Sequence, residues 1–313
     1  MTGKIITIVN RKGGVGKTTL TIGLADALLD DVNMRDAANA TLIVAVDLDP
    51  QASLTRALLH EPGNVDDGGR LGSVLKAKHT LAAALDEILK DKTAQVDAHV
   101  THRVGRIGFP FALLANDAGG WDIERHCLRK AGGEKKLKSA LKSLLLQLKK
   151  TYAYVLIDCP PGQTVIAEAA LEASDLILCP IAPDYLSFWG LESFDAYLRE
   201  LFADAGDDRP SARYVFTKWR AKPPAYDPQN KIADEVAHFA PPQQYVTLLH
   251  EVGGRPNVPP RAINMPFDPK LVTRLEGAPR PGRIWPFSKT FTSQTQIALK
   301  NLAVAVKQEL QRG

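Results

Sequence analysis

The chain has 313 residues, of which 45% are apolar and 24% are charged, and its formal net charge is +4. This composition excludes a mostly disordered chain, and no run of about 18 apolar residues indicates a membrane-spanning helix. The N-terminus lacks the pattern of a secretory signal, and the three cysteines fit neither a disulfide framework nor a CxxC metal site. We therefore expect a cytoplasmic protein in which residues 1–313 form one domain.

Strands and helices alternate along the first two thirds of the chain. The β-branched run Ile5–Val9 predicts a buried strand, the glycine-rich stretch Asn10–Gly16 a loop, and Thr18–Leu29 a helix. Further predictions are strands at 42–46, 107–115, 154–157, 176–179 and 214–216, helices at 137–148 and 188–205, and loops at 30–39 and 61–72. The alternation predicts an α/β fold with a mostly parallel, twisted sheet and helices on both faces.

The last part of the chain has a different character. Residues 222–290 are rich in proline and glycine and carry no long periodic run, which predicts an irregular surface portion; a terminal helix is predicted at about 292–311. From Val252 to Gly313 there are ten Lys or Arg and three Asp or Glu, whereas the rest of the chain has 29 and 32. A basic C-terminal portion on a mildly acidic body suggests an anionic partner.

The loop after the first predicted strand reads Lys-Gly-Gly-Val-Gly-Lys-Thr-Thr. A glycine-rich loop between a strand and a helix is typical of a phosphate-binding P-loop, whose N–H groups and helix N-terminus bind phosphate oxygens. We expect Lys17 to reach the β- and γ-phosphates and the Thr18 hydroxyl to ligate Mg²⁺. The predicted nucleotide-binding residues of the loop are Lys12, Gly13, Gly14, Val15, Gly16, Lys17, Thr18 and Thr19.

Carboxylates follow two of the predicted buried strands. Asp47 and Asp49 belong to the stretch Asp-Leu-Asp-Pro-Gln, and Asp158 follows the strand at 154–157. In open α/β sheets, ligands bind at the carboxyl ends of the strands. Asp158 is similar to a Walker B carboxylate that binds Mg²⁺ through its water shell, while the neighbouring Cys159 is interpreted as a packing residue.

One departure from the general P-loop pattern points to a family. Arg11 occupies the place of the first glycine, and Lys12 adds a second lysine. In this the chain resembles the deviant Walker A ATPases, the family of ParA and MinD, whose pattern is KGGxGKT. The resemblance implies that Lys12 reaches across a homodimer to the partner's nucleotide, that Asp47 holds Mg²⁺ through water, and that Asp49 orients the attacking water. The catalytic residues implied are Lys12, Lys17 and Asp49.

The resemblance covers most of residues 1–218 and continues more loosely beyond. It includes the stretches 113–117 and 180–192. The nearest match to the family's adenine-binding segment is Met265–Asp268, followed by Glu276–Pro279, which implies adenine contacts from Pro266 and Asp268. No helix-turn-helix domain precedes the P-loop, so the operator binding of larger ParA proteins is not expected.

The resemblance implies a ParA-type partition ATPase with ATP and Mg²⁺ as cofactors. Its ATP-bound homodimer would bind nucleoid DNA without sequence preference, and a ParB-like or adaptor protein would stimulate hydrolysis to segregate a plasmid, a chromosome or other cargo. The basic C-terminal portion fits this function, because contacts to phosphates give affinity that does not depend on sequence. The expected DNA contacts are Arg255, Arg261, Lys270, Arg274, Arg280 and Arg283.

Three alternatives stay open. A MinD-like membrane-cycling ATPase needs an amphipathic terminal helix with bulky apolar residues, but alanine is frequent here and a docked helix explains the pattern better. An iron–sulfur carrier or reductase of the same P-loop class needs two cysteines near a dimer interface, for which Cys127 is a candidate. A metabolic ligase or synthase on the same P-loop needs a substrate pocket that the sequence does not identify.

Overall fold

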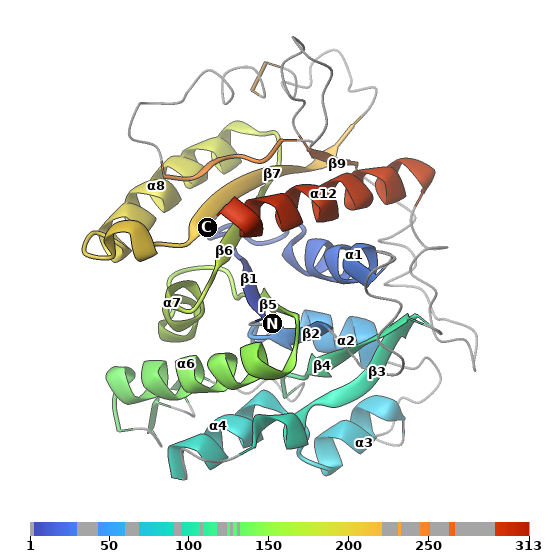
Figure 1. The fold of residues 1–313 in the computed structure, drawn as a ribbon, viewed down its shortest axis with the longest axis vertical. Coiled ribbons are helices and arrows are strands. Elements are labelled where there is room, and N and C mark those ends of the chain that lie inside the picture. The colour runs from blue at the N-terminus through green and yellow to red at the C-terminus, as the bar shows by residue number, and fades with distance from the viewer. Residues whose placement is uncertain are drawn as a thin grey trace.

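The computed structural model describes twelve stretches of the chain. These are residues 3–29, 43–59, 69–90, 95–106, 109–117, 124–125, 128–129, 132–220, 231–232, 245–250, 263–266 and 292–312. The described residues build a central sheet with helices on both faces (Figure 1). The α/β class and the mostly parallel sheet predicted from the sequence are thereby confirmed.

The sheet has the strand order β3-β4-β2-β5-β1-β6-β7-β8, and β9 also pairs with β7. All described pairs are parallel except β3 with β4. The central strands are short apolar runs buried along nearly their whole length, as expected where helices cover both faces. The strands are β1 Lys4–Ile8, β2 Ile43–Asp47, β3 Thr101–Arg106, β4 Phe109–Leu114, β5 Tyr154–Asp158, β6 Leu176–Ile181, β7 Ser211–Trp219, β8 Thr247–Leu248 and β9 Asn264–Pro266.

Two hydrophobic clusters separate the helices into layers. Side chains of α4, α6, α7 and α8 pack on one face of the sheet, and those of α1, α2, α3 and α12 pack on the other. The helices are α1 Lys17–Leu29, α2 Ser53–Leu59, α3 Arg70–Lys76, α4 Leu81–Lys90, α6 Glu134–Thr151, α7 Val165–Glu172, α8 Tyr185–Leu201 and α12 Ser293–Arg312, with 3₁₀ turns at Val96–His99 and Gly206–Asp208.

The terminal helix is docked against the body of the protein. α12 runs beside α1 (Figure 1) and buries Leu299, Leu302 and Val306 in the same cluster as α1. The packing is close: a Cβ added at Gly23 of α1 would lie 2.6 Å from Cδ2 of Leu299. The docked terminal helix expected from the sequence is therefore present. Among the described residues, no helix is both long and apolar enough to cross a membrane.

Three local predictions differ from the structure. The portion 222–290 is predicted to lack regular elements, yet β8 and β9 lie in it and extend the sheet beside β7. These strands have two and three residues, too few for any periodic pattern. α3 begins at Arg70, inside the predicted loop 61–72. α8 begins at Tyr185, three residues before the predicted start, because Asp184 accepts the Ser187 N–H and caps the helix there.

Candidate functional site

The glycine-rich loop joins β1 to α1. Backbone conformation requires glycine at some of its positions but not at others. Gly14 and Gly16 have φ values of +70° and +91°, in the left-handed region that favours glycine. Gly13 has no such φ, and a Cβ built on it would meet nothing within 4 Å. The chain's own packing thus does not require glycine at position 13. The open space along this backbone fits the close approach of a group from outside, such as a phosphate.

Two side chains, one after β1 and one in β7, hold the loop in place. Asn10, after β1, donates from Nδ2 to the Pro180 carbonyl at 2.7 Å and accepts the Lys12 N–H at 2.8 Å. Thr217 of β7 donates to the carbonyls of Val15, at 2.7 Å, and Ile181, at 3.1 Å. The P-loop is therefore anchored to β6 and β7 as well as to its own strand. Sequence reasoning did not identify Thr217, because it lies about 200 residues from its partner Val15.

The two lysines of the loop lie in different surroundings. Lys17 is buried, and its ammonium group lies 3.4 Å from the carbonyl oxygens of both Asn10 and Lys12. Its charge is thus held within the curve of the loop, where phosphate oxygens are expected. Lys12 turns away from this site and lies against the start of α8.

The ammonium group of Lys12 is bound by the first turn of α8. Its Nζ donates to Asp184 at 2.9 and 3.1 Å and to the Ser187 hydroxyl at 3.1 Å. Partial burial would raise the pKa of Asp184, but the bonds from Lys12 and Ser187 outweigh it and lower that pKa below its usual value. Both side chains of the ion pair remain partly exposed, at 38% for Lys12 and 42% for Asp184. The pair is therefore accessible to competing ions.

Two buried carboxylates stand side by side where β2 and β5 end. Asp47 and Asp158 are partners in the parallel register of these strands. Thr18 donates its hydroxyl proton to Oδ2 of Asp158 at 2.6 Å, while Oδ1 is buried without a partner among the described residues. Burial, and then the charge of Asp47, raise the pKa of Asp158 to about 8. An unpaired carboxylate oxygen beside a threonine hydroxyl fits the hydrated shell of Mg²⁺.

Asp47 is tied to its own chain by both of its oxygens. Oδ2 accepts the N–H and the hydroxyl of Thr55, each at 2.7 Å, and Oδ1 accepts the Asp49 N–H at 3.1 Å. Burial raises its pKa to about 6, although the Thr55 bonds oppose that shift. Its place beside Asp158 agrees with the predicted cation site. Its ligand role stays a prediction.

The turn that carries Asp49 is fixed through its backbone. The Asp49 carbonyl accepts from Nδ2 of Asn116 at 2.8 Å and from the Ala52 N–H at 2.7 Å. Ala52 is buried with a φ of +49°, a strained conformation for a residue with a side chain. The Asn116 N–H donates in turn to the Thr55 hydroxyl at 2.8 Å, which links this turn to Asp47. Sequence reasoning did not identify Thr55, and it included Asn116 only within a matching stretch.

The remaining predicted site residues lie in β9 or outside the described part of the chain. Pro266 lies in β9, beside Trp219 of β7. Asp268 and Cys127 lie outside the described residues, as do all six expected DNA contacts: Arg255, Arg261, Lys270, Arg274, Arg280 and Arg283. Cys159 is fully buried, and burial raises the pKa of its thiol, which fits the predicted packing role.

Clusters of metal-binding side chains are absent from the described stretches. No group of three or more His, Cys, Asp or Glu side chains there is placed to hold a metal ion. This is compatible with Mg²⁺, which proteins hold with one or two carboxylates together with substrate phosphates and water.

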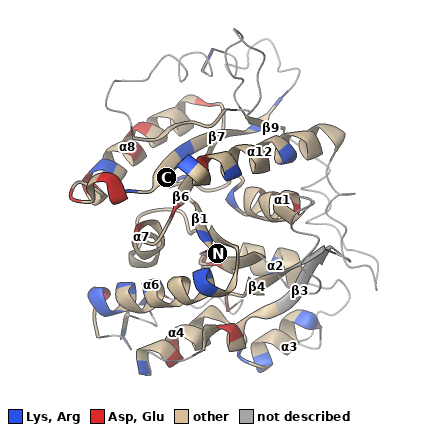
Figure 2. Ribbon diagram, viewed as in Figure 1, with Lys and Arg blue, Asp and Glu red and all other residues tan. Residues whose placement is uncertain are grey.

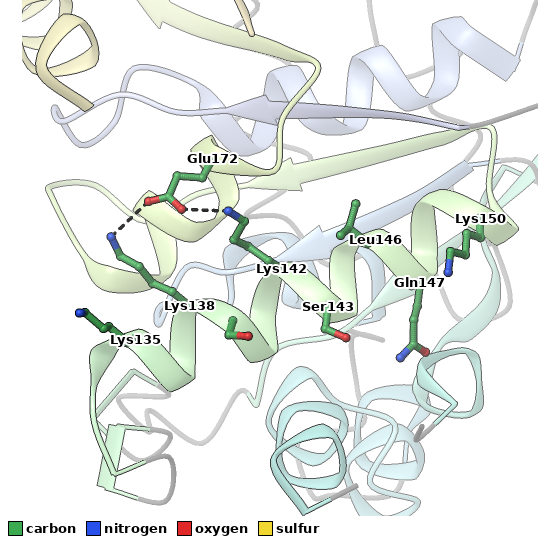
Figure 3. Close-up of a pocket in the computed structure, with 9 residues that line it drawn as sticks. Lys135, Lys138, Lys142, Ser143, Leu146, Gln147, Lys150 and Glu172 are labelled. Atoms are coloured by element: carbon green, nitrogen blue, oxygen red, sulfur yellow. Dashed lines mark hydrogen bonds and ion pairs between the residues drawn. The ribbon is translucent and has the colours of Figure 1, made fainter. Parts of the chain in front are cut away.

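A shallow hollow of about 650 Å³ lies along α6, separate from the P-loop (Figure 3). Glu172 of α7 reaches into it and binds Lys138 and Lys142 at 3.3 and 3.1 Å (Figure 3). Lysines mark both ends of α6 in Figure 2. None of the P-loop or strand-end residues lines this hollow, so it is not part of the candidate phosphate site.

Comparison with known proteins agrees with this geometry. The family model described as an AAA domain matches residues 3–205, about two thirds of the chain. The sporulation initiation inhibitor protein Soj of Bacillus subtilis is 31% identical over 189 residues, which make up 60% of this chain and 62% of Soj.

Solved structures share the whole fold. An ATP complex of McdA from Cyanothece has a TM-score of 0.65 at 18% identity, covering 98% of this chain and 97% of that one. Cobyrinic acid a,c-diamide synthase from Mycobacterium smegmatis, with a bound ATP analogue and magnesium, has a TM-score of 0.64 at 20% identity, covering 99% and 96%. At these identities the likeness concerns the fold alone.

Proposed function

This chain belongs to the AAA-domain family and is a ParA-type ATPase, and we propose that ATP and Mg²⁺ switch it between a monomer and a DNA-binding dimer. The observation that carries the proposal is a single edge of the sheet. There the anchored P-loop, with its two lysines, lies beside the carboxylates of Asp47, Asp49 and Asp158. This edge has the groups that binding and cleaving a nucleoside triphosphate require.

Different groups of the site bind the phosphates and neutralise the charge of the phosphate oxygens. The P-loop N–H groups and Lys17 bind the phosphates, and the backbone of Gly13 leaves room for them. Thr18 and Asp158 hold Mg²⁺, which when bound neutralises charge on the phosphate oxygens. Asp47 adds a second negative charge beside Asp158 and orders the turn of Asp49 through its bond to the Asp49 N–H.

Two residues act on the reaction itself. Asp49 orients the attacking water, and the bonds from Asn116 and Ala52 keep its turn in place. Positioning is sufficient here, because phosphoryl transfer through a loose transition state needs little proton abstraction before the bond to the leaving group breaks. Lys12 reaches the nucleotide of the second subunit and stabilises the charge that develops in the transition state. The dimer then depends on ATP, because the triphosphate lies between two lysines.

The dimer binds DNA through the basic C-terminal portion and acts in partition. The excess of Lys and Arg between Val252 and Gly313 supports a contact to phosphates that is independent of sequence. Dimerisation doubles this surface, so ATP controls DNA affinity by avidity. A ParB-like or adaptor protein then stimulates hydrolysis and releases the dimer from the nucleoid, which moves a plasmid, a chromosome or other cargo. The relatives named Soj and ParA support this proposal.

The test is binding to a non-specific DNA duplex with ATP, ADP or no nucleotide, across a series of salt concentrations. We expect binding with ATP alone, with an affinity that falls steeply as salt rises. Lys17→Ala, which removes the phosphate-binding ammonium group, is the control and should bind neither ATP nor DNA. Lipid vesicles in parallel reactions test the MinD-like alternative. DNA binding that ignores the nucleotide, or vesicle binding in its place, would refute the proposed switch.

A further inference from the structure

The first turn of α8 exposes two large apolar side chains next to each other. Leu186 is 67% exposed and Trp189 57%, and residues three apart on a helix are neighbours. The other exposed large apolar residues in the described stretches are Leu146, Ile297 and Val304. None of these three shares a helical turn with another. An exposed tryptophan beside an exposed leucine forms an apolar patch of the kind that marks an interaction site, and tryptophan is enriched among the residues that dominate interface energies.

The same turn of α8 also binds Lys12. Asp184 caps the helix and binds Lys12, and Ser187, which is buried, binds the same ammonium group. One turn of α8 therefore carries both the exposed apolar pair and the groups that bind the P-loop lysine Lys12. Gly13 follows Lys12 in the chain and is itself exposed, with open space where a Cβ would project. Nothing inside the subunit demands so small a residue there, which fits the close approach of another molecule.

We propose that Leu186 and Trp189 are the apolar anchors on which a second copy of this chain packs, and that this packing accompanies the transfer of Lys12 from Asp184 to the partner's nucleotide. The inference rests on the proposed function, which sends Lys12 across a dimer interface. The surface around that lysine must then face the second subunit, and a twofold axis brings the same patch from both chains to the interface.

The Lys12–Asp184 ion pair is weak enough for Lys12 to exchange Asp184 for a phosphate of the second subunit. A partly exposed ion pair contributes little stability, because water and salt screen it. A triphosphate carries more negative charge than one carboxylate, so Lys12 leaves Asp184 readily once the phosphates of a second subunit are within reach. DNA is a poor occupant for the patch itself, because Leu186 and Trp189 offer no cation to a phosphate.

The experiment measures dimerisation by sedimentation velocity with Mg²⁺ and a non-hydrolysable ATP analogue. Leu186→Ala and Trp189→Ala should each raise the dimer dissociation constant about tenfold or more, as expected for interface anchors. Ile297→Ala is the matched control, because Ile297 is 61% exposed on α12, and it should dimerise as the wild type does. Binding of a fluorescent ATP analogue to the monomer should stay within about twofold in all three variants, which also verifies folding.

Three results would overturn the inference, and they differ in what else they refute. If the wild type dimerises and both α8 variants dimerise equally well, the anchors are wrong while the proposed function stands. The anchors are equally wrong if those variants dimerise normally but lose DNA binding or stimulation, since the patch would then serve another partner. If the wild type forms no dimer with the ATP analogue, the inference and the proposed switch fail together.

Discussion

The two loop lysines are five positions apart, yet their neighbours give them separate tasks. Lys17 is buried against carbonyl oxygens of its own loop, whereas Lys12 is bound to a carboxylate on another helix. A lysine bound to carbonyl oxygens keeps its charge available to a phosphate. A lysine paired with a carboxylate must first exchange one anion for another. The second arrangement makes Asp184 a point of control over Lys12.

Replacing Asp184 should therefore strengthen ATP-dependent dimerisation. Asp184→Asn keeps a good helix cap for α8 but removes the charge that holds Lys12. We expect a dimer dissociation constant up to about thirtyfold lower than in the wild type, because each of the two subunits releases one exposed ion pair that contributes up to about 1 kcal/mol. Sedimentation velocity with a non-hydrolysable ATP analogue measures it.

A variant that also loses the cap separates the two roles of Asp184. Asp184→Ala frees Lys12 equally but should lower the free energy of unfolding by about 1 kcal/mol through loss of the cap. Urea denaturation of both variants measures that difference. An Asp184→Asn protein that dimerises less well than the wild type would show that the carboxylate helps the interface.

Asp49 offers a second test on a single residue. Asp49→Ala removes the carboxylate that orients water but leaves the carbonyl that Asn116 and Ala52 bind, so the turn should keep its shape. We expect turnover to fall by at least about 10²-fold, as for loss of a positioned catalytic group, while ATP affinity and dimerisation persist. Phosphate release and sedimentation of the same sample check both halves. Unchanged turnover would remove Asp49 from the mechanism.

At the scale of the elements, α1 and α12 pack closely because Gly23 of α1 lies against Leu299 of α12. Alanine in place of glycine inside a helix normally stabilises it by about 1 kcal/mol. At Gly23 the new Cβ would lie 2.6 Å from Cδ2 of the buried Leu299, and overpacking of this kind costs about 1–3 kcal/mol. We expect Gly23→Ala to lower the free energy of unfolding by up to about 2 kcal/mol in urea denaturation, the balance of these two effects.

The control lies on another helix. Gly190 of α8 has open space around a Cβ, so Gly190→Ala should raise the free energy of unfolding by a few tenths to about 1 kcal/mol. Adding Leu299→Ala to Gly23→Ala removes the contacted methyl groups. In a double-mutant cycle the two substitutions should therefore not be additive. Additive losses would mean that the helices adjust without strain.

Sequence patterns predicted the elements whose signal is local. Each of these elements can be recognised from its own five to eighteen residues. Examples are the apolar runs of β1, β2, β5 and β6 and the periodic leucines of α6. β8 and β9 have no such signal, because pairing with β7 creates them and their own residues do not. The same limit applies to the site: its motifs could be predicted, but the bonds of Thr217 to Val15 and of Asn116 to Asp49 join residues that only the fold brings together.

Positive charge is distributed unevenly over the whole molecule. The salt dependence of DNA affinity can show which of the basic residues contact DNA. Each phosphate contact changes the slope of log affinity against log salt by about 0.9. If Arg280 and Arg283 of both subunits contact DNA, replacing both with Ala removes four contacts from the dimer, which should reduce the slope by about 3.6 and weaken binding at low salt at least about tenfold. Fluorescence anisotropy of a labelled duplex, with ATP, measures both quantities.

Two lysines of the α6 hollow provide the matched control. Lys135 and Lys150 line this hollow and have no partner among the described residues (Figure 3). Replacing both with Ala removes as much positive charge as the arginine pair does. If only the net charge of the molecule matters, the two double variants should weaken binding equally; if DNA contacts the C-terminal portion, the α6 variant should keep the wild-type slope. A reduced slope in the α6 variant alone would move the DNA surface to that helix and refute the C-terminal assignment.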